Sequence, residues 1–142
     1  MELTFAGAAF AVKGRRIPAA CLSSMEAGTW SYAHAVADVI YWRVLFTELG
    51  YPPSGPTVVW GDNKPAIDTS TGHATSKASR HFIVRTIFNK WANGIGYDER
   101  YVEGRHIAED HNPSDFVSKW VDARKLERSV AFTHNTKNMV TP

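Results

Sequence analysis

The segment that most constrains the fold is TVVWGDNKPAI, residues 57–67. It begins with β-branched and aromatic residues, which favour a short buried strand. A turn with Asp62 and Asn63 follows, and Pro65 then indicates the start of a helix. In open α/β sheets, ligands bind beside the carboxyl ends of the strands. We therefore expect Asp62 to lie where such a fold keeps its functional site.

The composition favours one domain with a real core over a disordered chain. The sequence has 142 residues, of which 44% are hydrophobic and 12% aromatic. No apolar run approaches the roughly 20 residues that a membrane helix needs, so no membrane span is expected. The formal charge of +2 is too small to indicate a polyanionic partner by itself. Cys21 is the only cysteine, which excludes an internal disulfide and suits an intracellular, reducing compartment.

The first half of the chain alternates predicted strands and helices. Apolar runs at residues 3–12 and 17–22, joined by a polar turn, predict a β-hairpin. Ser23 and Glu26 have the spacing of a capping box, so a long helix is predicted to begin there and to end at Gly50. Its predicted buried stripe recurs at three and four residues and consists of Trp30, Ala33, Ala37, Ile40, Val44 and Leu45.

The second half contains polar loops and two further predicted helices. A loop is predicted at residues 69–76, a long helix at about 77–93, an edge strand at 97–102 and a polar loop at 103–111. Asn112 and Pro113 are typical of a helix start, so Asp115 is expected in the last helix. We predict one domain over residues 1–133 and a polar tail over residues 134–142.

Three carboxylates, those of Glu26, Asp62 and Asp115, fall at predicted helix starts. Taken singly, each has a structural explanation, because acids at these positions cap helices or complement the helix dipole. Taken together, they suit a divalent cation, since converging carboxylates repel one another and a metal ion offsets that repulsion. Both explanations stay open at this point.

Several segments resemble the ribonuclease H domain of copia-type LTR retrotransposon polyproteins. The resemblance is collinear and covers about residues 7–128. The central block, YWRVLFTELGYPPSGPTVVWGDNKPAI, is its most specific part. The supporting segments are LSSMEA at residues 22–27, SRHFIVRTIF at residues 79–88 and PSDFVSKWVDARKLER at residues 113–128.

The resemblance implies a ribonuclease H-like α/β fold, a mixed central β-sheet flanked by α-helices. It also implies cleavage of RNA in RNA–DNA hybrids with two Mg²⁺ or Mn²⁺ ions about 4 Å apart. Glu26, Asp62 and Asp115 match the family's metal-binding acids. His106 and His111 lie in the loop where many relatives carry a histidine that helps product release, and His111 is our candidate. Two solvated loop histidines are the alternative.

Hybrid recognition is expected to use backbone and 2′-hydroxyl contacts rather than base reading. The candidate nucleic-acid contacts are Asn63, Lys77, Arg80, Arg85 and Lys90. The alternative for the four basic residues is a solvated helix face.

The chain departs from the family at its N-terminus. The family's first catalytic aspartate sits on a central first strand, upstream of the segment that matches residues 7–12. Here Glu2 is the only acid before Glu26, and its surroundings do not match the motif. A smaller departure is Gly28, where the family usually has a second glutamate.

Three accounts fit the absent strand. The chain can be a fragment whose first strand lies upstream, another polypeptide can supply the strand by β-augmentation, or residues 1–12 can be rearranged to fill the gap. The first account makes an active ribonuclease H. The other two favour a degenerate, domesticated domain without a metal cofactor, acting as a structural or interaction subunit of a large complex such as a ribonucleoprotein. For this chain we favour the non-catalytic subunit over the active ribonuclease H.

Overall fold

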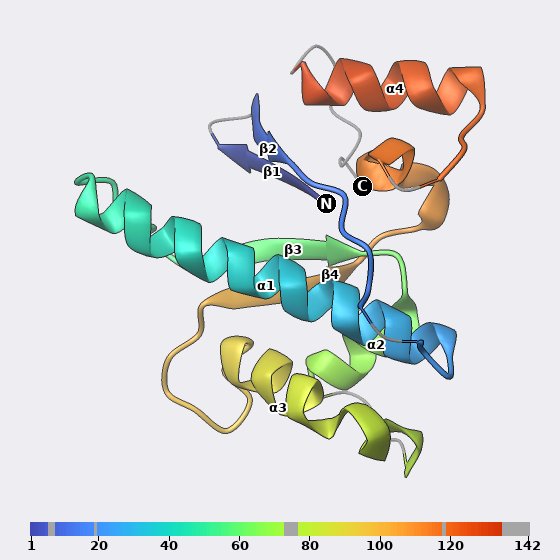
Figure 1. Cartoon of the computed structure of the whole chain (residues 1–142). Coiled ribbons are helices and arrows are strands. Elements are labelled where there is room, and N and C mark those ends of the chain that lie inside the picture. The colour runs from blue at the N-terminus through green and yellow to red at the C-terminus, as the bar shows by residue number, and fades with distance from the viewer. Residues whose placement is uncertain (6–7, 19, 73–76, 118, 135–142) are drawn as a thin grey trace. The chain divides into compact units, whose positions relative to one another are not determined.

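The computed structural model describes residues 1–5, 8–18, 20–72, 77–117 and 119–134. Within this part, the chain is a mixed α/β protein with four α-helices and two small sheets, which confirms the predicted α/β class (Figure 1). Its residues form two compact units, residues 17–106 and residues 1–16 together with residues from 107 onward. One domain over residues 1–133 stays a prediction, and the predicted tail beyond His134 lies outside the described residues.

A parallel strand pair forms the sheet of the first unit. β3 (Thr57–Gly61) pairs with β4 (Val102–His106), with Thr57 opposite Val102 and Gly61 opposite His106. The strand predicted from residue 57 is confirmed, whereas the edge strand predicted at 97–102 is wrong, because β4 only begins at Val102. Val102 is fully buried. A Cβ atom at Gly104 would lie 2.5 Å from the Tyr32 hydroxyl of α1, so glycine lets β4 approach this helix closely. Residues 103–106, predicted as part of a polar loop, therefore belong to a packed strand.

The long helix α1 (Ser24–Glu48) begins and ends as the sequence predicts. The Ser23 hydroxyl accepts a hydrogen bond from the Glu26 amide at 3.1 Å and caps the helix. Gly50 follows the C-cap with a positive φ of 88°, a conformation that glycine adopts without strain. Within its unit, α1 packs against β3, α2 and α3 (Figure 1).

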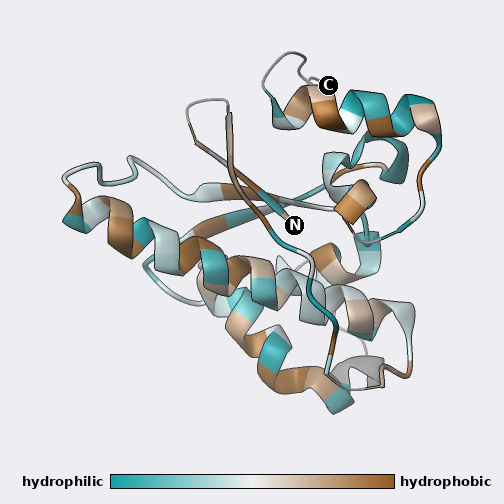
Figure 2. Ribbon diagram, turned by 45° about the horizontal axis from the view of Figure 1, so that its top comes forward, coloured by the Kyte–Doolittle hydropathy of each residue, from teal (hydrophilic) through white to brown (hydrophobic). Residues whose placement is uncertain are grey.

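The buried side of α1 differs from the predicted stripe. Ala37 and Val44 are exposed, which corrects the apolar periodicity. The residues that are buried include polar ones, and they are Thr29, Tyr32, Ala33, Val36, Asp38 and Val39. Figure 2 shows hydrophobic and hydrophilic residues interleaved along the helix, so its composition alone does not define one apolar face.

Two shorter helical segments complete this unit. α2 (Lys64–Ser70) is longer than predicted and takes up the first two residues of the expected loop. The predicted helix over 77–93 is instead a 3₁₀ segment, η1 (Lys77–Phe82), followed by α3 (Ile83–Ala92). Ile83 and Ile87 are 50% and 54% exposed, so α3 does not bury all of its apolar residues. The buried residues of α3 are Thr86, Asn89 and Ala92.

The second unit begins with a small antiparallel hairpin. β1 (Glu2–Phe5) pairs with β2 (Ala8–Val12), and Glu2 lies opposite Val12. The predicted hairpin between residues 3–12 and 17–22 is therefore wrong, and no described residue of 17–22 is in a strand. The apolar run at the N-terminus is long enough to supply both strands of a short hairpin by itself.

The other regular elements that the structure describes in this unit are helical. It contains the 3₁₀ segments η2 (Glu109–His111) and η3 (Pro113–Val117), followed by α4 (Ala123–Thr133). Asp115 lies in the 3₁₀ segment η3, which corrects its predicted place in the last helix. Across both units, none of the helices that the structure describes combines the length and apolar character required to span a bilayer.

Candidate functional site

Glu26 is used by the backbone at the start of α1. Its carboxylate accepts a hydrogen bond from the Leu22 amide at 2.8 Å, while its own amide donates to Ser23. This arrangement differs from a standard capping box only in that the carboxylate reaches one residue further back. The capping explanation for Glu26 is therefore confirmed, and its role as a metal ligand stays a prediction.

Asn63, rather than Asp62, caps α2. The Asn63 side-chain oxygen accepts a hydrogen bond from the Ala66 amide at 3.0 Å. Its side-chain nitrogen donates to the Ser24 carbonyl at 2.8 Å and so links the start of α2 to the start of α1. Asp62 directly follows β3 and is exposed. The capping explanation for Asp62 is thus wrong. Asn63, which the sequence suggested only as a nucleic-acid contact, caps α2 and links it to α1.

Gly28 makes room for this link. A Cβ atom at Gly28 would lie 2.6 Å from the Asn63 Cγ atom, closer than side chains approach. A glutamate, which the resembled family usually has here, would displace Asn63 from its two hydrogen bonds. The departure from the family at Gly28 therefore has a structural consequence at the joint between α1 and α2.

Asp62 and His106 mark the carboxyl edge of the β3–β4 pair. Gly61 lies opposite His106 in the register, so Asp62 follows the residue that faces His106. Both side chains are exposed. Over the described ranges, however, no three histidine, cysteine, aspartate or glutamate side chains lie close enough to hold one metal ion. The convergence of Glu26, Asp62 and Asp115 on a metal stays a prediction.

The four basic candidates are divided between two elements, η1 and α3. The Arg85 guanidinium lies over the Trp30 ring, 2.9 Å from its centroid, and is engaged in a cation–π contact within the unit. Arg80 is exposed on η1, and Lys90 is half-buried on α3. The Lys77 side chain lies outside what the structure describes. Nucleic-acid contacts by these residues stay predictions.

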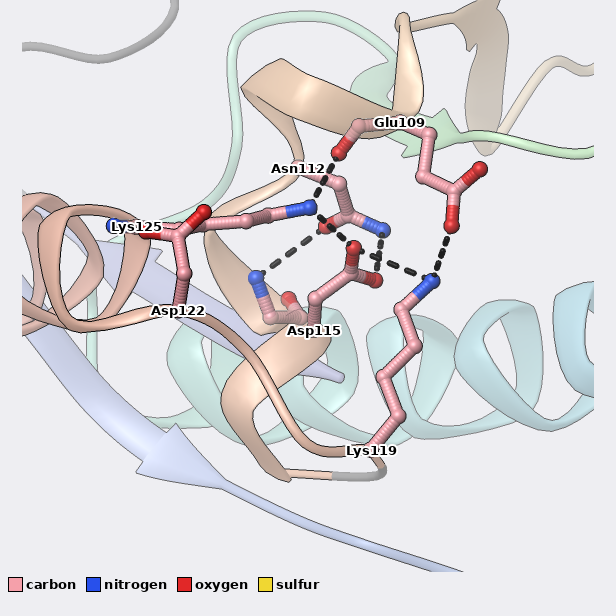
Figure 3. A network of polar contacts seen from close by, with 7 residues as sticks. Glu109, Asn112, Asp115, Lys119, Asp122 and Lys125 are labelled. Atoms are coloured by element: carbon pink, nitrogen blue, oxygen red, sulfur yellow. Dashed lines mark hydrogen bonds and ion pairs between the residues drawn. The ribbon is translucent and has the colours of Figure 1, made fainter.

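Asp115 lies at the centre of a polar network in the second unit (Figure 3). The residue is only 3% exposed. Its Oδ2 atom lies 2.6 Å from the Lys125 ammonium nitrogen and 3.1 Å from that of Lys119. Its Oδ1 atom accepts a hydrogen bond from the Asn112 side chain at 3.2 Å. Two cations of the protein itself therefore neutralise this carboxylate.

Both lysines also contact Glu109. The Lys125 ammonium donates to the Glu109 carbonyl at 2.7 Å, and the Lys119 ammonium donates to the Glu109 carboxylate at 2.6 Å. The hydrogen bond with Glu109, together with that to Asp115, raises the pKa of Lys119 above its ordinary value. The cluster of Asp115, Glu109, Lys119 and Lys125 pairs two negative with two positive charges.

This geometry does not fit the metal that the resemblance implies at Asp115. A divalent cation binds to carboxylate oxygens, and Oδ2 is already in contact with two ammonium groups. His111, the predicted catalytic histidine, is exposed at the end of η2, and its role in product release stays a prediction.

Lys125 and Lys119 are the site residues that sequence reasoning missed. The available signal was weak: Lys119 lies four residues after Asp115, a spacing that favours an ion pair on a helix. Nothing in the sequence marks Lys125, which comes from α4 and is 8% exposed. Comparison with protein-family models, curated proteins and solved structures finds no match to this chain.

Proposed function

We propose that this chain is a ribonuclease H-like domain derived from a copia-type LTR retrotransposon polyprotein, acting as a non-catalytic structural or interaction subunit of a larger assembly. The sequence motifs support the ancestry. The unit of residues 17–106 supports it further, since a long helix precedes a parallel strand pair and Asp62 follows the first strand of that pair. The ion pairs of Asp115 with Lys119 and Lys125 support a non-catalytic role.

The observation that carries the interaction role is the unpaired edge of β3. Among the described residues, β3 has β4 as its only strand neighbour. The Thr57 amide donates to the Tyr101 carbonyl beside β4. Because amides alternate along a strand, those of Val58 and Trp60 point to the opposite edge. An unpaired strand edge is a template for a strand of another segment, and an isolated two-stranded sheet is only marginally stable.

The side chains on this strand support the same role. Val58 and Trp60 are 37% and 41% exposed, whereas Val59 between them is 8% exposed. One face of β3 is therefore packed within the unit, and the other presents apolar side chains. A partner that adds a strand would cover both the edge and these side chains.

Amide hydrogen exchange measured by NMR on the full chain tests this proposal. We expect the amides of Val58 and Trp60 to exchange much faster than that of Val59, which points towards β4. Val59 is the matched control because it belongs to the same strand. Equal protection of all three amides in the isolated chain would contradict the proposal, since the edge would then already be paired.

The alternative is an active metal-dependent ribonuclease H that cleaves RNA in RNA–DNA hybrids with Mg²⁺ or Mn²⁺. The observation that favours it is Asp62, which is exposed at the carboxyl end of β3 and does not cap a helix. This function predicts hybrid cleavage that Asp62→Asn abolishes, because the substitution removes a negative charge from the metal site while keeping the side-chain shape.

A further inference from the structure

We infer that the Lys125 ammonium is the built-in counter-cation of Asp115, so that Asp115 is a structural anion of this unit and binds no divalent metal ion. The inference goes beyond the proposed function, because it assigns a role to a lysine that the resemblance does not mark. It stands on the geometry of the Asp115 cluster, whatever the ancestry of the chain.

Burial is the first argument. Asp115 and Lys125 are 3% and 8% exposed, so water solvates neither charge well. A buried charge requires a partner, and the 2.6 Å contact between Asp115 Oδ2 and Lys125 Nζ provides one for both residues. Each of these two charges is therefore needed by the other in the folded unit.

The position of the ammonium is the second argument. Lys125 Nζ is held by two oxygens, Asp115 Oδ2 and the Glu109 carbonyl, at 2.6 and 2.7 Å. The Asp122 side chain accepts a hydrogen bond from the Lys125 amide at 2.8 Å and fixes the first turn of α4 (Figure 3). Lys125 is thus anchored at its backbone as well as at its charged end, and a metal ion would have to displace a fixed cation.

The packing of α4 is the third argument. The residues of α4 that are buried are Lys125 and Ser129, whereas Leu126 and Val130 are 43% and 40% exposed. Helices usually bury their apolar side chains. Here the helix turns a lysine inward, towards Asp115 of η3. The ion pair therefore has a structural role in joining α4 to η3.

The charge balance of the cluster is the fourth argument. Glu109 and Asp115 contribute two negative charges, and Lys119 and Lys125 contribute two positive charges. A divalent ion added at Asp115 would leave the cluster with a net charge of +2 and would lie beside two ammonium groups. Like charges that lie next to each other in a buried cluster repel strongly.

Paramagnetic broadening by Mn²⁺ in NMR spectra of the full wild-type chain tests the inference without any substitution. We expect the amide signals of Asp115 and its neighbours in η3 to broaden no more than those of Leu126 and Val130 on the exposed side of α4. Selective broadening around Asp115 at low Mn²⁺ concentration would overturn the inference.

Thermal unfolding of two lysine variants provides a second, independent readout. Lys125→Met should lower the melting temperature more than Lys119→Met, because the Lys119 side chain is 41% exposed and that of Lys125 only 10%. Adding Asp115→Asn to Lys125→Met should recover part of the loss, since the buried group that lost its 2.6 Å contact with Lys125 is then uncharged. Equal effects of the two single lysine variants would contradict the structural role of Lys125.

Discussion

Single polar residues hold together the interior of the unit formed by residues 17–106. Asn89 is fully buried and donates to the Thr29 carbonyl and to the Ser70 hydroxyl. Asn93, 4% exposed, donates to the Tyr32 hydroxyl at 3.1 Å and accepts from the Gly104 amide at 2.8 Å. Directional hydrogen bonds between buried groups favour one arrangement of the elements that carry them.

Tyr32 gives a residue-scale prediction about alkaline pH. Burial, the largest influence, raises the pKa of its hydroxyl to about 12, from the ordinary value of about 10. The folded chain therefore retains this proton where the unfolded chain loses it, so the Tyr32 contribution to stability is fully present below about pH 10 and is lost as the pH rises towards about 12. Tyr32→Phe should remove this loss of stability, which amounts to roughly 3 kcal/mol across the window.

Urea unfolding of the wild type and of Tyr32→Phe at neutral and alkaline pH measures this effect. At neutral pH the variant should be less stable by about 1 kcal/mol, because it loses the hydrogen bond with Asn93. The difference should shrink as the pH rises. A difference that stays constant over the whole range would contradict the assignment to Tyr32.

At the scale of elements, the joint between α1 and α2 depends on close approach. Gly28 on α1 faces the Asn63 side chain, which caps α2 and bonds to the Ser24 carbonyl. Alanine normally stabilises a helix interior relative to glycine by about 0.5–1 kcal/mol. Here we expect Gly28→Ala to destabilise the fold by about 1–2 kcal/mol, because its methyl group would displace Asn63 from its hydrogen bonds.

The matched control for this prediction is Gly55→Ala. A Cβ atom at Gly55 would meet no atom within 4 Å, and the residue lies in a loop. The free energy of unfolding of Gly55→Ala, measured in urea, should remain close to that of the wild type. A Gly28→Ala variant that is more stable than the wild type would show that helix propensity outweighs the contact with Asn63.

Locally determined elements could be predicted from the sequence, whereas faces and pairings could not. The strand at residues 57–61, the Ser23 cap and the Gly50 stop each depend on a few neighbouring residues, and all three were predicted correctly. The buried face of α1 depends on distant partners such as Asn93. Apolar spacing cannot reveal such polar contacts, and for the same reason the sequence did not indicate the pairing of Asp115 with Lys125.

At the scale of the whole molecule, the three predicted metal-binding acids are divided between the two units. Glu26 and Asp62 lie within residues 17–106, and Asp115 lies in the other unit. Glu26 accepts from the Leu22 amide, and Asp115 contacts Lys119 and Lys125, each within its own unit. Carboxylates employed in this way agree with our proposal of a non-catalytic role, which does not follow from a fold alone.

Cleavage of an end-labelled RNA–DNA hybrid by the full chain, with Mg²⁺ or Mn²⁺, tests this account most directly. The wild type should release no more RNA fragments than Asp62→Asn or buffer alone at any metal concentration. Metal-dependent cleavage by the wild type that Asp62→Asn abolishes would contradict the account and establish the active ribonuclease H instead.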